Sequence, residues 1–176
     1  MTILSAAYPA AEVTRVSDGD YSEAVLRLIR SSVAQCLCDV FIIDHDLQRD
    51  LDVRVDRVLL ELAAASWRGV DTRLLIGGSR DVPEIRGATL LAWERARELG
   101  VEARLAAASR GRSSHAKLVI ADGSVLIGSH NWSRGMFGDE TQDSVLLESP
   151  ALAAAMRTYF NDKWTAVSRD DYDVSI

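Results

Sequence analysis

The sequence predicts an α/β protein in which a mixed β-sheet is sandwiched between helices. Apolar runs of strand length alternate along the chain with segments in which apolar residues recur at helical spacing. The dipeptide Asp122-Gly123 lies between two apolar runs, which is typical of a tight hairpin and adds an antiparallel pair to the sheet. No repeat or Pro/Gly/Ser-rich linker interrupts the 176 residues, so we expect one domain over residues 1–176.

The individual elements follow from the same periodicity. Apolar residues at helical spacing predict helices over residues 21–34, 53–67, 83–100 and 150–167. Short apolar or alternating runs predict strands over residues 39–44, 71–77, 101–106, 115–121, 124–128 and 143–147. Gly69 is placed to end the second of these helices, and Pro83 to begin the third.

The charge of the chain limits its partners. A net charge of −6 argues against broad, non-specific affinity for nucleic acid, which normally depends on a basic surface. Basic residues are nevertheless concentrated in one stretch that holds a single acid, Asp122. They are Arg104, Arg110, Arg112, Lys117 and Arg134. This stretch is either a funnel for an anionic substrate or a solvated loop, and the sequence leaves both interpretations open.

The cellular setting is predicted from what the sequence lacks. Cys36 and Cys38 lie two residues apart in an apolar run, so we expect buried thiols in a reducing compartment rather than a disulfide. The first eleven residues do not resemble a secretion signal, and no window approaches about 18 consecutive apolar residues. We therefore expect a cytoplasmic protein without a membrane span.

Two pairs of polar residues mark the candidate site. His115 and Lys117 are two residues apart on one predicted strand, so their side chains project from the same face. Ser129 and Asn131 have the same spacing at the end of the next strand. If the hairpin pairs these strands, an imidazole, an ammonium, a hydroxyl and an amide converge on one small volume. That set suits a phosphate group, because it offers a nucleophile, a cation and neutral donors for the non-bridging oxygens.

The segment from His115 to Asn131 resembles the signature of the phospholipase D superfamily, H-x-K-x4-D-x6-G-S-x-N. The matching positions are His115, Lys117, Asp122, Gly128, Ser129 and Asn131. Five residues separate Asp122 from Gly128 where the family usually has six, which shortens the hairpin. The resemblance implies a phospholipase D-like fold. It also implies that Gly128 contributes to the substrate-binding loop and that Asp122 supports the turn.

The resemblance further implies the mechanism and the partner. Each active site of the family uses two copies of the motif, and this chain has one, which points to the small homodimeric members such as the Nuc-type endonucleases. His115 of one subunit would attack phosphorus to give a phosphohistidine, and His115 of the other would act as general acid and then as base. Lys117, Ser129 and Asn131 of both chains would hold the phosphoryl oxygens. No metal or other cofactor is needed, because two lysines supply the positive charge.

A histidine nucleophile needs a carboxylate that orients its ring through the other nitrogen. In the family a glutamate about a dozen residues beyond the motif asparagine has this role. Asp143 is the best positional match, although it is one methylene shorter, and Glu140 is the second choice.

Other candidates have simpler explanations. We interpret His45 as a surface loop residue, although it could lie at the edge of the sheet that carries the site. His130 should point away from the site by strand alternation, and Trp132 should pack in the interior. The last predicted helix carries four large apolar residues at helical spacing that suit a core or a dimer contact. They are Met156, Tyr159, Phe160 and Trp164.

Three functions fit these features. The leading hypothesis is a metal-independent nuclease for DNA or RNA, with Arg110 and Arg112 in a basic substrate-binding loop. The second is hydrolysis of a phospholipid or another small phosphodiester, against which stands the lack of a basic amphipathic helix. The third is a non-catalytic subunit that binds phosphate or nucleic acid within a larger complex.

Overall fold

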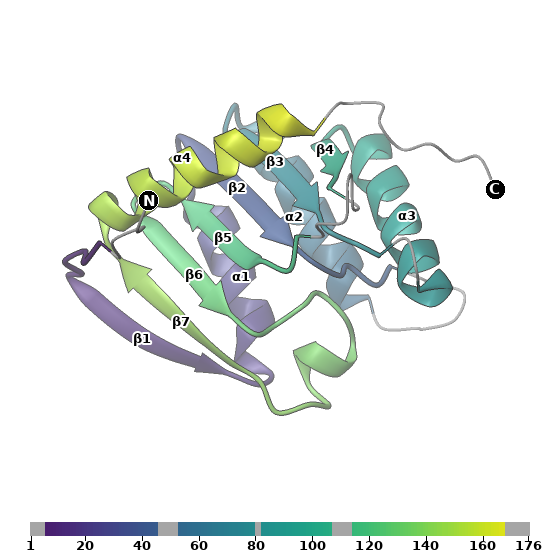
Figure 1. Cartoon of the computed structure of the whole chain (residues 1–176), viewed down its shortest axis with the longest axis horizontal. Helices are drawn as coiled ribbons and strands as arrows, with labels where there is room; N and C mark the ends of the chain where they lie inside the picture. Colours follow the sequence, from purple (N-terminus) through teal and green to yellow (C-terminus); the bar gives the residue numbers. More distant parts are fainter. Residues whose placement is uncertain (1–5, 46–52, 80–81, 107–113, 168–176) are drawn as a thin grey trace, which may run out of the picture.

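The computed structural model describes residues 6–45, 53–79, 82–106 and 114–167. They form one seven-stranded sheet with the strand order β1-β7-β6-β5-β2-β3-β4, flanked by helices (Figure 1). The strands are β1 (Glu12–Ser17), β2 (Gln35–Val40), β3 (Asp71–Ile76), β4 (Glu102–Leu105), β5 (Lys117–Ala121), β6 (Ser124–Gly128) and β7 (Asp143–Glu148). The helices are α1 (Asp20–Ser31), α2 (Arg54–Trp67), α3 (Pro83–Glu98), α4 (Pro150–Ala166) and the short 3-10 turn η1 (Gly135–Phe137).

The sheet is mixed, as predicted. Strands β2, β3 and β4 are parallel to one another, whereas β5 pairs antiparallel with β2 and the remaining pairs are antiparallel. The start of β5 therefore lies beside the carboxyl end of β2, and the end of β6 lies on the other side of β5. Three segments meet at this edge of the sheet: the loop after β2, the loop after β6 and the segment before β5.

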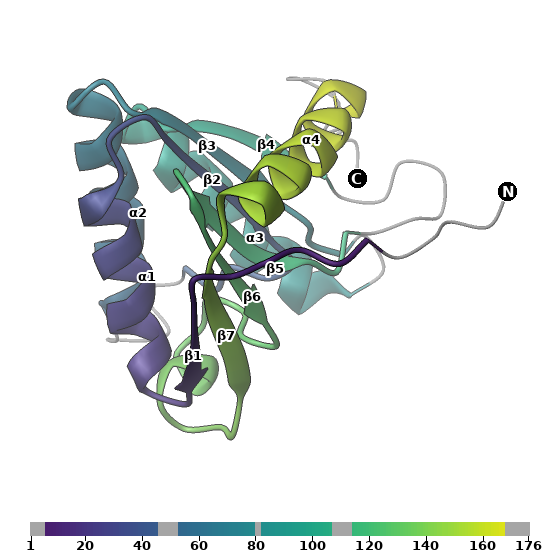
Figure 2. The ribbon, with the colours of Figure 1, turned by 90° about the vertical axis from the view of Figure 1, so that its left-hand side faces the viewer.

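Helices cover both faces of the sheet, which confirms the predicted α/β sandwich. Helices α1, α2 and α3 pack on one face and α4 crosses the other (Figure 2). Alternation along the strands separates the two cores: on β2, Cys36 and Cys38 face the three-helix layer, while Leu37 faces α4. Both cysteines are buried and free, as expected. None of the helices in the described ranges is long and apolar enough to cross a membrane.

The two largest corrections to the predicted elements concern β2 and β1. Strand β2 begins at Gln35, not at residue 39, because Cys36, Leu37 and Cys38 form the buried ladder. The apolar residues 41–43 instead lie beyond the paired part of β2, in the loop that follows this strand. Strand β1 was not predicted at all. It is an edge strand with Val16 as its one buried residue, so it lacks the apolar run by which strands are recognised.

Candidate active site

Lys117 is the first residue of β5, and His115 lies two residues before it, outside the strand that was predicted to begin at residue 115; the two side chains contact each other. The Nζ atom of Lys117 is 3.0 Å from Nδ1 of His115 and 3.0 Å from the backbone oxygen of the same residue. His115 is exposed, and its ring lies 4.4 Å from that of Phe41, the residue that follows β2. Because an ammonium only donates hydrogen bonds, the imidazole nitrogen is the acceptor in this contact.

Lys117 is a buried cation. The residue is 7% exposed, with Nζ 4.9 Å from the centre of the Phe41 ring. Burial lowers the pKa of Lys117 below its ordinary value, and the negative charge of Asp39 on the neighbouring strand partly opposes this. The protein therefore holds a partly desolvated positive charge next to an exposed imidazole, an arrangement that suits the binding of an anion.

Asn131 is tied to the same edge by the loop that follows β2. Its Oδ1 accepts a hydrogen bond from the backbone N–H of Ile42 at 3.1 Å, and Ile43 forms a parallel bridge with Trp132. Because Oδ1 is engaged, the amide group of Asn131 offers its N–H donors to a ligand. Trp132 is completely buried, which confirms its predicted packing. The sequence predicted the convergence of Asn131 with the His115 strand, but it gave no sign of the role of residues 41–43.

The shortened hairpin fixes the position of Ser129. A two-residue turn pairs Ala121 with Ser124 and Leu118 with Ile127, so that Ser129 follows directly on β6. The hydroxyl of Ser129 exchanges hydrogen bonds of 3.1 Å with the backbone of Asp143, donating to the carbonyl and accepting from the N–H. Ser129 is exposed, yet its hydroxyl is bound to β7 rather than turned toward His115 or Lys117.

Gly128 is needed for packing between strands. A Cβ at this position would collide with the backbone of Asp143 and with Ser144 on β7. The glycine of the motif therefore lets β6 and β7 approach closely just before Ser129. The structure gives this reason for Gly128 and does not test its predicted contact with substrate.

Asp122 supports the hairpin, as the resemblance implied. It adopts a positive φ of 48°, and its carboxylate accepts hydrogen bonds of 2.9–3.0 Å from the backbone N–H groups of Val33, Ala34 and Gln35. Burial alone would raise the pKa of Asp122, but the three donors outweigh it and lower the pKa below its ordinary value. The residue thus links the turn to the chain that enters β2.

The carboxylates that were predicted to orient His115 lie elsewhere in this structure. Asp143 pairs with Arg15 on β1 at 2.7 Å. Glu140 folds back over Gly135 in η1. The hydrogen bonds of His115 run to Lys117 instead. The orienting role of Asp143 or Glu140 remains a prediction.

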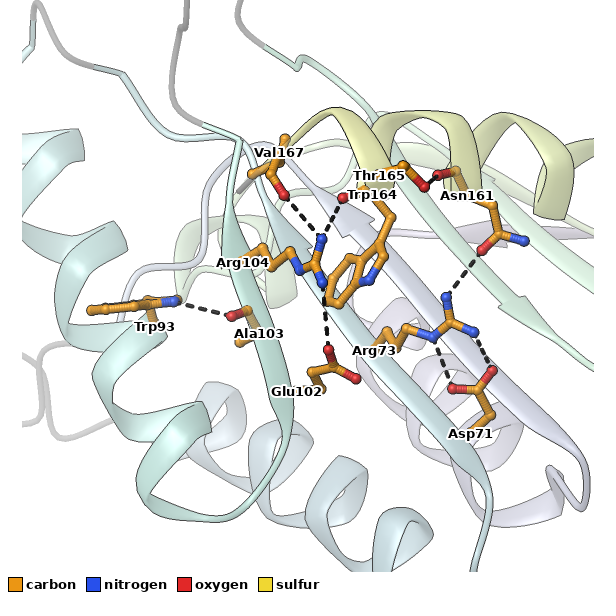
Figure 3. Close-up of polar contacts among 10 residues, drawn as sticks. All are labelled: Asp71, Arg73, Trp93, Glu102, Ala103, Arg104, Asn161, Trp164, Thr165 and Val167. Atoms are coloured by element: carbon orange, nitrogen blue, oxygen red, sulfur yellow. Dashed lines mark hydrogen bonds and ion pairs between the residues drawn. The ribbon is translucent and has the colours of Figure 1, made fainter. Parts of the chain in front are cut away.

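The basic stretch divides into separate environments. Arg104 donates to the carbonyls of Trp164 and Val167 at 2.6 and 2.9 Å and stacks on the Trp164 ring, so it anchors the end of α4 (Figure 3). Arg134 is exposed and pairs with Asp139. Arg110 and Arg112, the predicted substrate-binding arginines, lie outside the described residues. Of the basic residues in the predicted funnel that the structure describes, Lys117 is therefore the one that lies in the site.

The other two histidines are part of the framework. His130 was predicted to point away from the site; it is completely buried, stacks on Tyr21 at 4.1 Å and contacts Ser144 with Nδ1, so it lies in the core. His45 lies 2.9 Å from Asp56 and is half-buried, not the plain surface residue that we expected. Within the ranges that the structure describes, no group of three or more His, Cys, Asp or Glu residues could hold a metal ion.

Sequence reasoning missed three residues beside the site. Asp39 on β2 is completely buried, and its carboxylate binds Ser114, the residue before His115, and Lys163 of α4. The available signal was the charge of Asp39, which is the one charged residue in the otherwise uncharged Gln35–Val40 strand.

Fold and motif together define a phospholipase D-like protein, and comparison of the sequence with family models gives the same result. The model described as "Cardiolipin synthase, PLD-like domain" matches residues 25–164, a range that includes every motif position from His115 to Asn131. The chain belongs to this phospholipase D-like family. No curated protein sequence matches the chain at a significant level.

Solved structures show the same fold. Nuc from Salmonella typhimurium, a phospholipase D family member, has 20% sequence identity and a TM-score of 0.70, with 89% of this chain and 97% of Nuc covered. NucT from Helicobacter pylori has 13% identity and a TM-score of 0.61, over 89% and 98% of the two chains. Phosphatidylserine synthase from Haemophilus influenzae has 15% identity and a TM-score of 0.70, but the match covers 38% of that longer chain.

Proposed function

We propose that the protein is a metal-independent phosphodiesterase that cleaves DNA or RNA as a homodimer through a phosphohistidine intermediate. The observation that carries this proposal is the pairing of exposed His115 with the buried ammonium of Lys117 at 3.0 Å. A phosphate needs a nucleophile and a positive charge together, and family membership supplies the reaction class.

The proposed chemistry needs two imidazoles. One His115 attacks phosphorus and forms a P–N bond while the P–O bond to the leaving alkoxide breaks. The second His115 gives its proton to that oxygen, then removes a proton from water as the water attacks the phosphohistidine and restores the first ring. Lys117 and Asn131 hold the non-bridging oxygens. Since the chain has one such motif, a second copy supplies the second imidazole.

An uncovered part of the sheet supports pairing with a second copy. Helix α4 does not extend over the lower ends of β1, β6 and β7 in Figure 2. Ile127 and Val145, which pair with each other on β6 and β7, are 38% and 37% exposed and line a shallow pocket with Gly128 and Asp143 at the edge of the site. Burial of this apolar surface would favour association.

The direct test is cleavage of single- and double-stranded DNA and RNA in excess EDTA. We expect cleavage by the wild type and none by His115→Ala. Activity that disappears with EDTA, or that persists in His115→Ala, contradicts the mechanism. Trapping of a ³²P-labelled subunit by an alkaline denaturing quench, in which a P–N bond survives, would identify the covalent intermediate if the label is absent in His115→Ala.

A phospholipid or another small phosphodiester is the alternative substrate. The observation in its favour is the fold shared with a phosphatidylserine synthase. Liposome hydrolysis measured beside nucleic-acid cleavage separates the two. If neither substrate is cleaved while the protein still binds DNA, a non-catalytic binding function replaces both.

A further inference from the structure

A buried ion pair joins β2 to α4 next to the start of β5. The carboxylate of Asp39 is completely buried and pairs with the ammonium of Lys163. Ser114 lies between them: its hydroxyl donates to Asp39 at 3.0 Å and accepts from Lys163 Nζ at 2.6 Å. Every polar group of the cluster is therefore satisfied by another member of it.

Stability alone does not explain this cluster. Asp39 occupies the face of β2 that also carries Leu37, which packs in an apolar core under α4. An apolar pair at such a position is often as stable as a buried ion pair, because burial removes both charges from water. The carboxylate does something that a leucine could not do: it binds the hydroxyl of Ser114, the residue directly before His115.

The segment that carries His115 is held on several sides. Phe41 donates its backbone N–H to Ala116 O at 2.8 Å, and the Phe41 ring contacts the imidazole. Gly77 lies so close to the carbonyl of Ser114 that a Cβ there would collide with it. Ser114 is thus the point at which contacts from β2, α4 and the end of β3 meet, one residue from the imidazole.

We propose that Asp39 and Lys163 are positioning residues of the active site, which act through Ser114 to hold His115 against Lys117. The catalytic consequence rests on the proposed phosphodiesterase function, whereas the positioning of the imidazole does not. Ser114 carries the link, so its hydroxyl can be removed while the buried ion pair is left intact.

The variants are chosen to separate this link from general support of α4. Ser114→Ala removes the hydroxyl, and Ser114→Thr keeps it. Asn161→Ala is the matched control, because Asn161 also ties α4 to the sheet, accepting from Arg73 at 3.1 Å, but at β3 (Figure 3). We expect Ser114→Ala to lower kcat by about 10- to 100-fold with KM changed by less than about threefold, while Ser114→Thr and Asn161→Ala stay near wild type.

A second readout does not depend on activity. The chain has three histidines, so ¹⁵N–¹H spectra of the imidazoles can be assigned with His115→Ala. We expect the His115 signals to shift in Ser114→Ala and to keep their wild-type positions in Ser114→Thr and Asn161→Ala. Unchanged His115 signals in Ser114→Ala overturn the proposal. Shifted signals in a protein without phosphodiesterase activity support the positioning role and refute the proposed function.

Discussion

Lys117 is buried in the sheet, yet its ammonium lies 3.0 Å from Nδ1 of the exposed His115. His115 lies two residues before Lys117, the first residue of β5, and Phe41 contacts both side chains. A positive charge at this position attracts a phosphate to the imidazole that would attack it. The relationship between these two residues thus combines both requirements of the proposed reaction.

The first prediction concerns the alkaline limit of activity. Burial lowers the pKa of Lys117 below 10.5, so a reaction that needs its ammonium should lose rate at a lower pH than an ordinary lysine would allow. In Lys117→Arg the guanidinium stays charged, and this alkaline decline should disappear even if the changed geometry lowers kcat. Profiles of kcat against pH for both proteins provide the measurement. An identical decline in the arginine variant would assign it to another group.

Subunit mixing tests whether the site is shared. If only a dimer with two intact imidazoles is active, mixtures of wild type with His115→Ala should lose activity as the square of the wild-type fraction. An equal mixture at constant total protein, after subunit exchange, would then retain about one quarter of the activity. The control is wild type diluted with buffer above the dissociation constant of the dimer. A linear decline in the mixtures would show that each chain works alone.

The sequence predicted the fold class and the motif strands well, because apolar alternation and the Asp122-Gly123 turn are local signals. It placed β2 four residues too late, since residues 41–43 are as apolar as the strand itself. The bond of Asn131 to Ile42 and the cluster around Asp39 join residues 75 to 124 positions apart. Contacts of that separation depend on the sheet order, which no local pattern specifies.

Asp122 should be important for stability at neutral pH. Replacement by alanine leaves three backbone N–H groups without their charged acceptor, which should cost about 1–3 kcal/mol of the free energy of unfolding. The folded pKa lies below 3.8, so this contribution is complete above the unfolded pKa and is lost as the pH falls through the folded value. Urea unfolding at neutral and acid pH should show the difference shrinking in acid. Glu94→Ala, exposed on α3, is the control.

Two glycine replacements should have opposite effects. Gly128→Ala places a Cβ against Asp143 and Ser144 of β7, so we expect a loss of about 1–3 kcal/mol in unfolding free energy. Gly87→Ala meets no atom within 4 Å on the exposed side of α3 and should stabilise the helix by about 0.5–1 kcal/mol. Thermal unfolding of both variants gives the comparison. A neutral Gly128→Ala would mean that β6 and β7 separate without cost.

His130 should make the fold sensitive to mild acid. Burial lowers its pKa below 6.5, although Asp18 and Asp143 oppose the shift, so protonation favours the unfolded chain. Its contribution is complete above about pH 6.5, the unfolded pKa, and is lost as the pH falls toward the folded value. His130→Phe with Ser144→Ala keeps a ring against Tyr21 and removes the hydroxyl left unpaired. Between neutral pH and about pH 5, unfolding free energy should fall less steeply in this double variant than in Ser144→Ala alone. Equal slopes would assign the acid sensitivity to a group other than His130.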